Sequence, residues 1–157
     1  MDDLDSLKKA RNRALRYLTY RPRTISELKK YLIGKQFAPQ IVDLVVGEMV
    51  EYGYLNDESY TEDFINYRKA RGFGSKRIRY ELMLKGIDRE IIEEKIAAKN
   101  SSDEDRQAMR ELVERRLPAD KITDERWVAR QAAFLQRRGY ANNLIFEILR
   151  DFQVIED

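Results

Sequence analysis

The residues best suited to chemistry lie between Phe64 and Lys85, and nearly all of them are cations. This stretch carries seven positive charges and a single negative one, Glu81. The cations are Arg68, Lys69, Arg71, Lys76, Arg77, Arg79 and Lys85. Such a density of like charge indicates an anionic partner.

Side chains for catalysis are scarce. The chain has no cysteine and no histidine, which excludes disulfides, thiolate nucleophiles, cysteine-based zinc sites and the commonest general base. Gly72-Phe73-Gly74 lacks the third glycine, the preceding strand and the lysine pattern of nucleotide cradles, so we interpret it as a joint between helices. We expect no enzyme activity, no cofactor and no metal site.

Aromatic residues could do a second kind of chemistry, the stacking of nucleic-acid bases. Trp127, Phe134 and Tyr140 could act in this way, but their helical spacing favours the hydrophobic core. Four tyrosines lie among the cations, and the sequence assigns them no role: Tyr17, Tyr20, Tyr31 and Tyr67.

Helices must position these side chains. Charged residues make up 37% of the chain, with only seven glycines and three prolines, which is typical of solvated helices rather than of a sheet with many turns. Residues 24–27 match a capping box, and Asn56-Asp57 and Thr123-Asp124 supply side chains that cap helix starts. Between such signals the periodicity predicts nine helices.

Two of the predicted helices have apolar faces that the spacing defines. The face of the third helix consists of Ile41, Leu44, Val45, Glu48 and Met49. The face of the fourth helix consists of Tyr60, Phe64 and Tyr67. Both sets follow the helical period, so we expect these side chains to point toward the core.

The chain repeats itself at intervals of 50 and 53 residues. Leu32, Leu82 and Leu135 correspond to one another, and four residues after each comes a turn residue: Gln36, Gly86 and Gly139. An apolar residue follows the turn in each case: Phe37, Ile87 and Tyr140. We therefore expect an all-α protein of three tandem three-helix repeats, spanning residues 1–55, 56–100 and 101–157, that form a solenoid-like chain.

Charge alternates along the chain. Residues 8–35 hold ten cations and one anion, whereas residues 36–63 hold seven anions and no cation. If equivalent helices share one side of a solenoid, the protein has a positive and a negative side despite its net charge of +2. The candidate partner-binding residues on the positive side are Arg21, Arg23, Lys35, Arg68, Arg71, Lys76, Arg77, Arg79 and Lys85.

The sequence also bears on the location of the protein. The acidic start lacks the basic and apolar regions of a signal peptide, and no apolar run approaches the length of a membrane span. We expect a cytoplasmic protein with no membrane partner.

Three segments resemble, in order and spacing, the motifs of the RecX family. They are ALRYLTYRPRTISELKKYL at residues 14–32, GYLND at residues 53–57 and RGFGSKRIRYELMLKGI at residues 71–87. The resemblance implies three tandem three-helix repeats in an elongated, curved monomer. It also implies a non-enzymatic regulator of homologous recombination and the SOS response, which binds the RecA filament on DNA and limits its extension and activities. Some RecX-like proteins also bind single- or double-stranded DNA directly.

Carried over by position, the arginines, lysine and glycines typical of the family fall on Arg21, Arg23, Arg71, Gly72, Gly74, Arg77, Lys85 and Gly86. This chain departs from the family at Tyr60-Thr61, where Phe-Ala is common, and in the negative end from Glu147 to Asp157. Contacts made by the third repeat are therefore the least defined.

An alternative reading is a stand-alone, tandem helix-turn-helix-like nucleic-acid-binding protein. The hairpin formed around each turn residue fits such a motif. No helix, however, carries Asn, Gln and Arg at the successive positions that would read base edges. A RecA regulator is the favoured interpretation.

Overall fold

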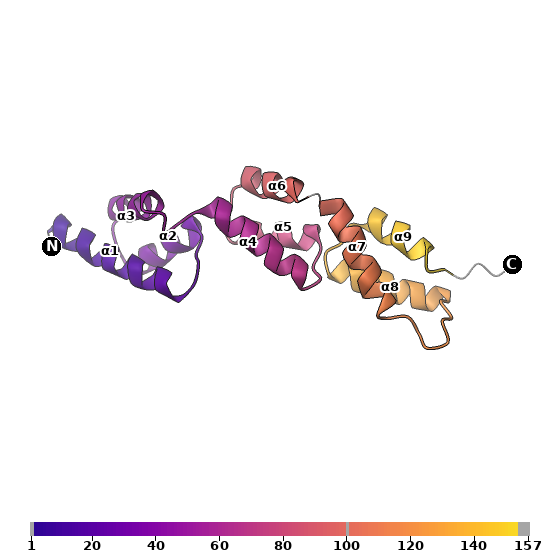
Figure 1. The fold of residues 1–157 in the computed structure, drawn as a ribbon. Helices are drawn as coiled ribbons and strands as arrows, with labels where there is room; N and C mark the ends of the chain where they lie inside the picture. The colour runs from indigo at the N-terminus through magenta and orange to yellow at the C-terminus, as the bar shows by residue number, and fades with distance from the viewer. Residues whose placement is uncertain (1, 100, 154–157) are drawn as a thin grey trace. The chain divides into compact units, whose positions relative to one another are not determined.

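The computed structural model describes residues 2–99 and 101–153. All regular structure in this part of the chain is helical, which confirms the predicted fold class (Figure 1). The helices are α1 (Asp3–Tyr20), α2 (Ile25–Gly34), α3 (Pro39–Glu51), α4 (Asp57–Ala70), α5 (Ser75–Leu84), α6 (Arg89–Ala98), α7 (Ser101–Glu114), α8 (Glu125–Arg137) and α9 (Asn142–Arg150). Of these described helices, none is long and apolar enough to cross a membrane.

The predicted caps begin the helices as expected. Asn56 accepts a hydrogen bond from the backbone N–H of Ser59 at 3.0 Å, and Asp124 accepts one from Trp127 at 2.8 Å. Thr24 accepts from the N–H of Glu27 at 3.1 Å. A capping box also predicts a reciprocal hydrogen bond from the backbone N–H of Thr24 to the Glu27 carboxylate. That prediction is wrong, because the Glu27 carboxylate pairs with the Arg21 guanidinium at 2.6 Å instead. The positive charge of Arg21 competes successfully for this carboxylate.

The helices pack as two compact units, and each unit includes part of the second repeat. Unit 1 comprises Met1–Asp63 and Leu82–Ile92, and unit 2 comprises Phe64–Glu81 and Glu93–Asp157. The divisions fall inside α4, α5 and α6. A single helix of the second repeat can therefore contribute to both cores.

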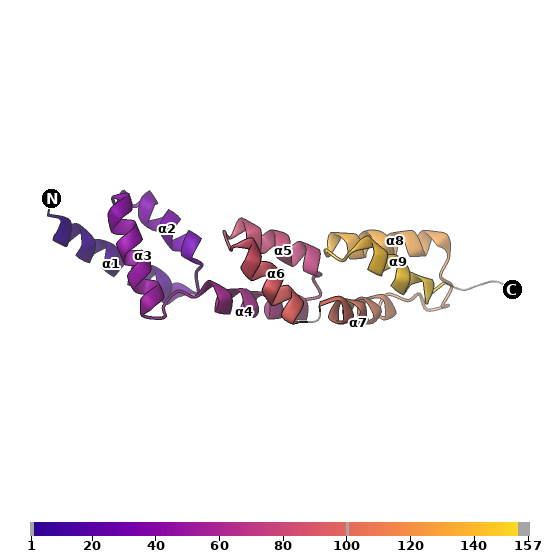
Figure 2. The same cartoon turned by 90° about the horizontal axis from the view of Figure 1, so that it is seen from above.

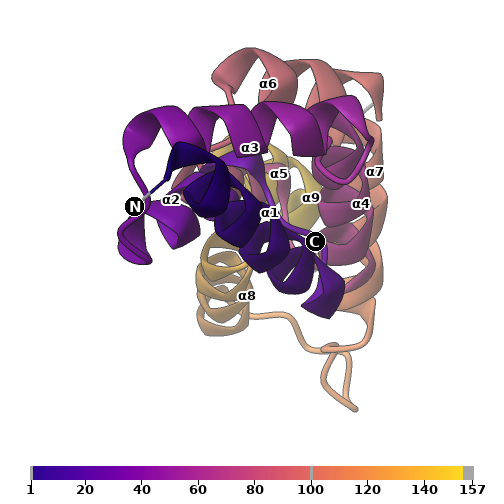
Figure 3. The ribbon, with the colours of Figure 1, turned by 90° about the vertical axis from the view of Figure 1, so that its left-hand side faces the viewer.

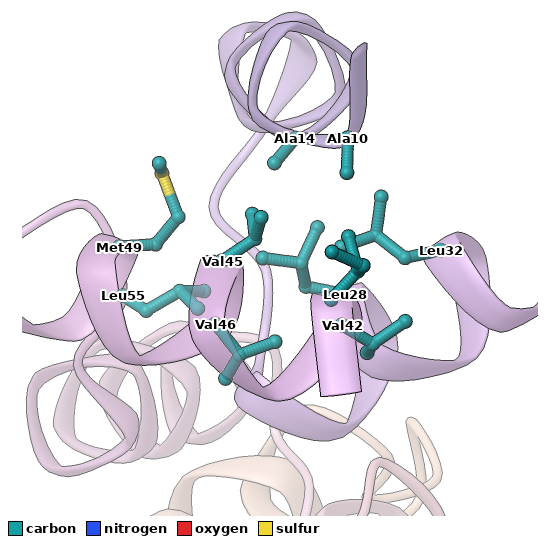
Figure 4. Close-up of a cluster of buried hydrophobic side chains, with 10 residues drawn as sticks. Ala10, Ala14, Leu28, Leu32, Val42, Val45, Val46, Met49 and Leu55 are labelled. Carbon is teal, nitrogen blue, oxygen red and sulfur yellow. The ribbon is translucent and has the colours of Figure 1, made fainter. Parts of the chain in front are cut away.

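The core of unit 1 forms where α3 packs against both α1 and α2 (Figure 2). Ala10 and Ala14 project from α1 toward the larger side chains of α2 and α3 (Figure 4). Alanine at these positions lets the helix backbone approach closely, because its side chain occupies little space. The larger buried residues are Leu28, Leu32, Ile41, Val42, Val45, Val46, Met49 and Leu55.

The core of unit 2 forms where α9 packs against both α7 and α8 (Figure 2). Trp127 and Tyr140 are buried in it, as their spacing predicted, and the indole N–H of Trp127 donates to the carbonyl of Arg116 at 3.2 Å. Between α7 and α8 the chain runs as a long loop, visible in Figure 3. The other buried residues of this cluster are Met109, Val113, Leu135, Leu144, Ile145, Ile148 and Leu149.

Two of the predicted apolar faces contain errors. In α4 the fully buried residues are Thr61 and Ile65, whereas Tyr67 is 53% exposed. Thr61 tolerates burial because its hydroxyl donates to the carbonyl of Asp57 at 2.7 Å. In α3, Leu44 is 57% exposed, since Val42 and Val46 widen the buried stripe on its opposite edge.

The predicted turn residues are equivalent in backbone conformation. Gln36, Gly86 and Gly139 all have positive φ, at 70°, 78° and 91°. The N–H of the following residue donates in each case to the carbonyl of Leu32, Leu82 or Leu135, at 3.3, 3.2 and 3.2 Å. This is the Schellman helix ending, and the three leucines are fully buried as predicted.

Successive repeats join through the same contact in both units. In unit 1, the hydroxyl of Thr24 donates to the carbonyl of Lys85 at 2.9 Å, and Asp57 accepts from the N–H of Ile25 at 2.9 Å. In unit 2, the N–H of Gly74 donates to the carbonyl of Arg138 at 2.8 Å. Here Asp105 accepts from the N–H of Ser75 at 3.3 Å and from its hydroxyl at 2.9 Å. In each case the start of a helix in one repeat is fastened to the turn and first helix of the next.

Candidate functional site

The Gly72-Phe73-Gly74 segment forms the tight turn between α4 and α5, and it positions the cations around it. Gly72 has φ = 83°, and the N–H of Phe73 donates back to the carbonyl of Arg68 at 3.2 Å. A Cβ atom on Gly74 would lie 2.5 Å from the carbonyl oxygen of Gly139. Glycine at position 74 therefore allows this turn to pack directly on the turn between α8 and α9.

Three guanidinium groups surround the ring of Phe73. The carbon atoms at their centres lie 3.8 Å from the ring centroid for Arg68, 4.6 Å for Arg77 and 4.8 Å for Arg138. Glu81 is the carboxylate of this group, and it accepts hydrogen bonds from Arg68 at 2.6 Å and Arg77 at 3.0 Å. We call these five residues the Phe73 cluster. Three positive charges against one negative charge leave it positive, and the aromatic ring further stabilises the cations.

Arg138 was not among the predicted site residues. Its guanidinium also donates to the carbonyl of Arg71 at 2.9 Å, which ties the turn after α8 to the end of α4. The repeat pattern contained the signal for this residue, because Arg138 occupies the place of Lys35 and Lys85 in the other two repeats.

Arg71 and Lys76 flank the Phe73 cluster and are exposed. Arg71 lies over the ring of Tyr67 at 4.5 Å, and within the described residues neither cation forms an ion pair. Arg79 differs, because it is half-buried and binds both carboxylate oxygens of Glu93, at 2.6 and 3.3 Å. Of the predicted residues in unit 2, Arg71 and Lys76 are thus the most available to a partner.

Two of the predicted cations of unit 1 lie on a pair of stacked tyrosines. The rings of Tyr17 and Tyr31 are parallel within 4° and their centroids are 4.0 Å apart. Arg23 lies over Tyr17 at 4.0 Å, and Lys35 lies over Tyr31 at 5.6 Å. We call these four residues the tyrosine stack. The sequence assigned no role to the tyrosines that lie among the cations. Two of them, Tyr17 and Tyr31, each contact a cation through the face of the ring.

The remaining predicted residues of unit 1 are also engaged. Arg21 is exposed and pairs with Glu27, whose carboxylate lies 3.9 Å from Arg23 as well. Lys85 is half-buried, with its ammonium nitrogen 5.9 Å from the ring centroid of Tyr60. The predicted residues are therefore less free than the sequence suggested, because carboxylates of the same repeat pair with the arginines and aromatic rings lie under several of the cations. The expectation that all nine share one positive side of the chain stays a prediction.

Burial affects the ionisation of the carboxylates at the two joints. Desolvation raises the pKa of Asp105, although hydrogen bonds from Ser75 partly oppose this. Burial likewise raises the pKa of Asp57, against the hydrogen bond from the N–H of Ile25. Elsewhere in unit 1, the Arg11 guanidinium lowers the pKa of Glu48 through two hydrogen bonds of 2.7 and 2.9 Å. Groups of three or more metal-ligating side chains are absent from the described residues.

These features define an all-helical protein of three tandem three-helix repeats. Its cations lie on aromatic rings, close to the turns through which neighbouring repeats contact each other. Family models for the first, second and third three-helix domains of RecX match residues 10–49, 56–96 and 103–149. The chain belongs to the RecX family.

Individual relatives support this assignment. The regulatory protein RecX of Trichlorobacter lovleyi is 34% identical over 138 residues, which cover 86% of this chain and 90% of that protein. The RecX of Pseudomonas savastanoi pv. phaseolicola is 32% identical over 146 residues, which cover 93% of this chain and 93% of that protein. The chain spans 54% of the length of the Bacillus subtilis RecX, with 32% identity.

A solved structure has the same fold. The crystal structure of RecX from Lactobacillus salivarius matches 95% of this chain and 97% of its own, with a TM-score of 0.85 and 22% identity. Together with the three family-model matches, it supports the assignment of three three-helix repeats.

Proposed function

We propose that this protein is a non-enzymatic regulator of the RecA recombinase, which binds the RecA filament on DNA and restrains its extension in recombination and in the SOS response. Membership of the RecX family across all three repeats supports this proposal. The observation that carries it at the level of residues is the positive Phe73 cluster with its exposed neighbours Arg71 and Lys76. A regulator of a filament on DNA acts where the DNA is, so we place it in the cytoplasm.

The cations of this surface divide into two roles. Arg68, Arg77 and Arg138 are held by Phe73, Glu81 and backbone carbonyls, so they shape the surface and give it a positive potential. Arg71 and Lys76 are exposed without a carboxylate partner in the described residues, so they can pair with phosphates or with acidic side chains. This division predicts that replacing the second set removes binding without disturbing the fold.

The test is the extension of RecA filaments on single-stranded DNA, measured with the parent protein and with R71E/K76E. We expect the variant to remain folded, because exposed substitutions change stability by only about 0.5 kcal/mol each, and to lose most of its restraint on extension. The matched control is R126E/R130E, which reverses two exposed arginines of α8 and should behave like the parent. A folded R71E/K76E protein that restrains RecA fully would place the interface elsewhere.

Direct binding to naked single-stranded DNA separates the two possible contacts. If Arg71 and Lys76 meet phosphates, the variant should weaken DNA binding and reduce the log–log salt slope by about 1.4, or about 0.7 for each lost contact. If they meet acidic side chains of RecA, naked-DNA binding should be weak already in the parent, and only filament binding should be lost.

A further inference from the structure

A hollow of about 320 Å³ lies on unit 1, beside α1 and the turn that follows α2. Its lining consists of Lys9, Asn12, Arg13, Arg16 and Phe37. We call it the basic hollow. None of these residues belongs to the Phe73 cluster or to the tyrosine stack, so the candidate interface described above does not account for it.

Comparison of the repeats explains why this surface is open. A shift of 99 residues places Ala10 and Ala14 of α1 on Met109 and Val113 of α7, the buried residues of the two helices. The same shift places Arg13 on Leu112. In unit 2, Leu112 packs beside Gly72 of the preceding repeat, within 3.6 Å of where a Cβ atom on that glycine would lie.

The residues in the turn after α2 lead to the same conclusion. Phe37 corresponds to Tyr140, and the hydroxyl of Tyr140 donates to the carbonyl of Gly72 at 2.9 Å. The basic hollow thus occupies, on the first repeat, the place of the surface by which the third repeat contacts the second. Here an arginine replaces the leucine that makes this contact in the third repeat.

Arg13 in place of a leucine makes this surface polar, but polarity alone does not explain a surface of one sign. The lining of the basic hollow includes three cations and no carboxylate. Lys9 pairs with Asp5 at 3.0 Å, and both side chains are more than half exposed. Arg13 and Arg16 form no ion pair with any described residue, so no carboxylate among those residues neutralises their charge.

The start of α3 adds to the positive potential. This helix begins at Pro39, two residues after Phe37, and the side chain of the preceding residue, Ala38, cannot cap it. The partial positive charge of a helix N-terminus therefore lies close to the hollow. Guanidinium groups bind the oxygens of a phosphate through paired hydrogen bonds, and Asn12 supplies a further amide donor.

We propose that the basic hollow binds a phosphate group, with Arg13 and Arg16 as its main ligands. The phosphate can belong to a nucleic-acid backbone or to a small free phosphate compound. This site is separate from the interface proposed for RecA, and its failure would leave that proposal unaffected.

The test uses the full chain and inorganic pyrophosphate as the probe. In ¹H–¹⁵N NMR titrations at constant ionic strength, pyrophosphate should shift the resonances of Asn12, Arg13, Arg16 and Phe37 in a saturable manner. The variant R13Q/R16Q should bind at least tenfold more weakly. The control R126Q/R130Q removes the same charge from exposed residues of α8 and should bind within twofold of the parent. Circular dichroism confirms that both variants are folded.

A second titration with labelled single-stranded DNA identifies the source of the phosphate. If the ligand is a nucleic-acid backbone, R13Q/R16Q should reduce the log–log salt slope of DNA binding by about 1.4. If DNA binding is unchanged while pyrophosphate binding is lost, the ligand is a free phosphate compound. An absence of saturable shifts, or equal pyrophosphate affinity in R13Q/R16Q and the parent, would overturn the proposal and leave the hollow as a solvated surface without a ligand.

Discussion

Individual residues at the joints between repeats carry much of the specificity of this fold. Gly74, Gly86 and Gly139 all lie where a Cβ atom would come within 2.6 Å of a neighbouring atom. Asp57 accepts a hydrogen bond from the start of α2, and Asp105 accepts one from the start of α5. The joint between repeats 1 and 2 is therefore built in the same way as the joint between repeats 2 and 3. Substitution at these positions should therefore disturb packing rather than the helices.

Gly74 provides the sharpest case. The substitution Gly74→Ala places a methyl group against the backbone of Gly139, which cannot move away as a flexible side chain would, so we expect a loss of about 1–3 kcal/mol of unfolding free energy. Gly47→Ala is the matched control, because its site in α3 has open space around it. Alanine there should stabilise the helix by about 0.5–1 kcal/mol. Urea denaturation measures both, and equal effects would show that the joint yields easily.

Asp105 predicts a pH dependence of stability. Its pKa in the folded protein lies above the ordinary value of 3.8, so the folded state binds more protons than the unfolded state in the interval between the two pKa values. The contribution of Asp105 to the unfolding free energy is therefore greatest below pH 3.8 and falls as pH rises through the folded pKa. Asp105→Asn should remove this decline while its amide oxygen still accepts from Ser75.

Asp105→Ala separates charge from hydrogen bonding. Alanine leaves the N–H and hydroxyl of Ser75 without their acceptor, which should cost about 1–3 kcal/mol. Urea denaturation from pH 3.5 to 7 should rank the asparagine variant above the alanine variant throughout. If Asp105→Asn retained the parent's pH slope, another group would be responsible for it.

At the scale of elements, the helix boundaries and turns were predictable because they depend on local signals in the sequence. Caps such as Asn56 and Asp124, and the turn residues at positions 36, 86 and 139, act within a few residues of themselves, so a sequence displays them directly. The buried face of α4 was missed because its core residue Thr61 is polar and its large residue Tyr67 faces solvent. Burial there depends on neighbouring helices that periodicity does not identify.

The candidate site was predictable only in part, for the same reason. Counting charge located Arg71 and Lys76 correctly as exposed cations. It did not foresee that Glu93 would pair with Arg79, or that Arg138 would reach Phe73 from 65 residues away in the chain. The first contact depends on how α5 and α6 pack within the second repeat, and the second on how the third repeat packs on the second, so no local pattern encodes either of them.

The turn residues offer a test at this scale, because equivalent positions hold different residues. Gln36 adopts φ = 70° with its side chain exposed, so Gln36→Gly should relieve strain and raise stability slightly, by about 0.5 kcal/mol. Gly86→Gln makes the opposite change at φ = 78°, where a Cβ atom would also collide with Ser26. We expect a loss of at least about 2 kcal/mol. Thermal unfolding of the two variants should differ in sign; losses of similar size would mean that the turns are not equivalent in energy.

At the scale of the whole molecule, the second repeat belongs to both compact units. In α5, Ile78 lies in unit 2 and Leu82 lies in unit 1, and both are fully buried. Repeat proteins gain stability from each repeat and from contacts between neighbours, so a local defect spreads by steps. The two units should therefore unfold in a coupled but graded manner.

Hydrogen exchange can measure this coupling. Leu135→Ala removes a fully buried side chain from unit 2 and should cost about 2–5 kcal/mol. We expect the amides of α8 and α9 to lose most protection, the amide of Ile78 to lose less, that of Leu82 less again, and that of Leu32 to keep its protection, because each step away crosses further intact packing. Leu32→Ala is the matched control in unit 1 and should produce the reverse gradient. Equal loss at Leu32 and Leu135 in both variants would instead show a single all-or-none unit, in which the shared helices transmit the whole of a defect.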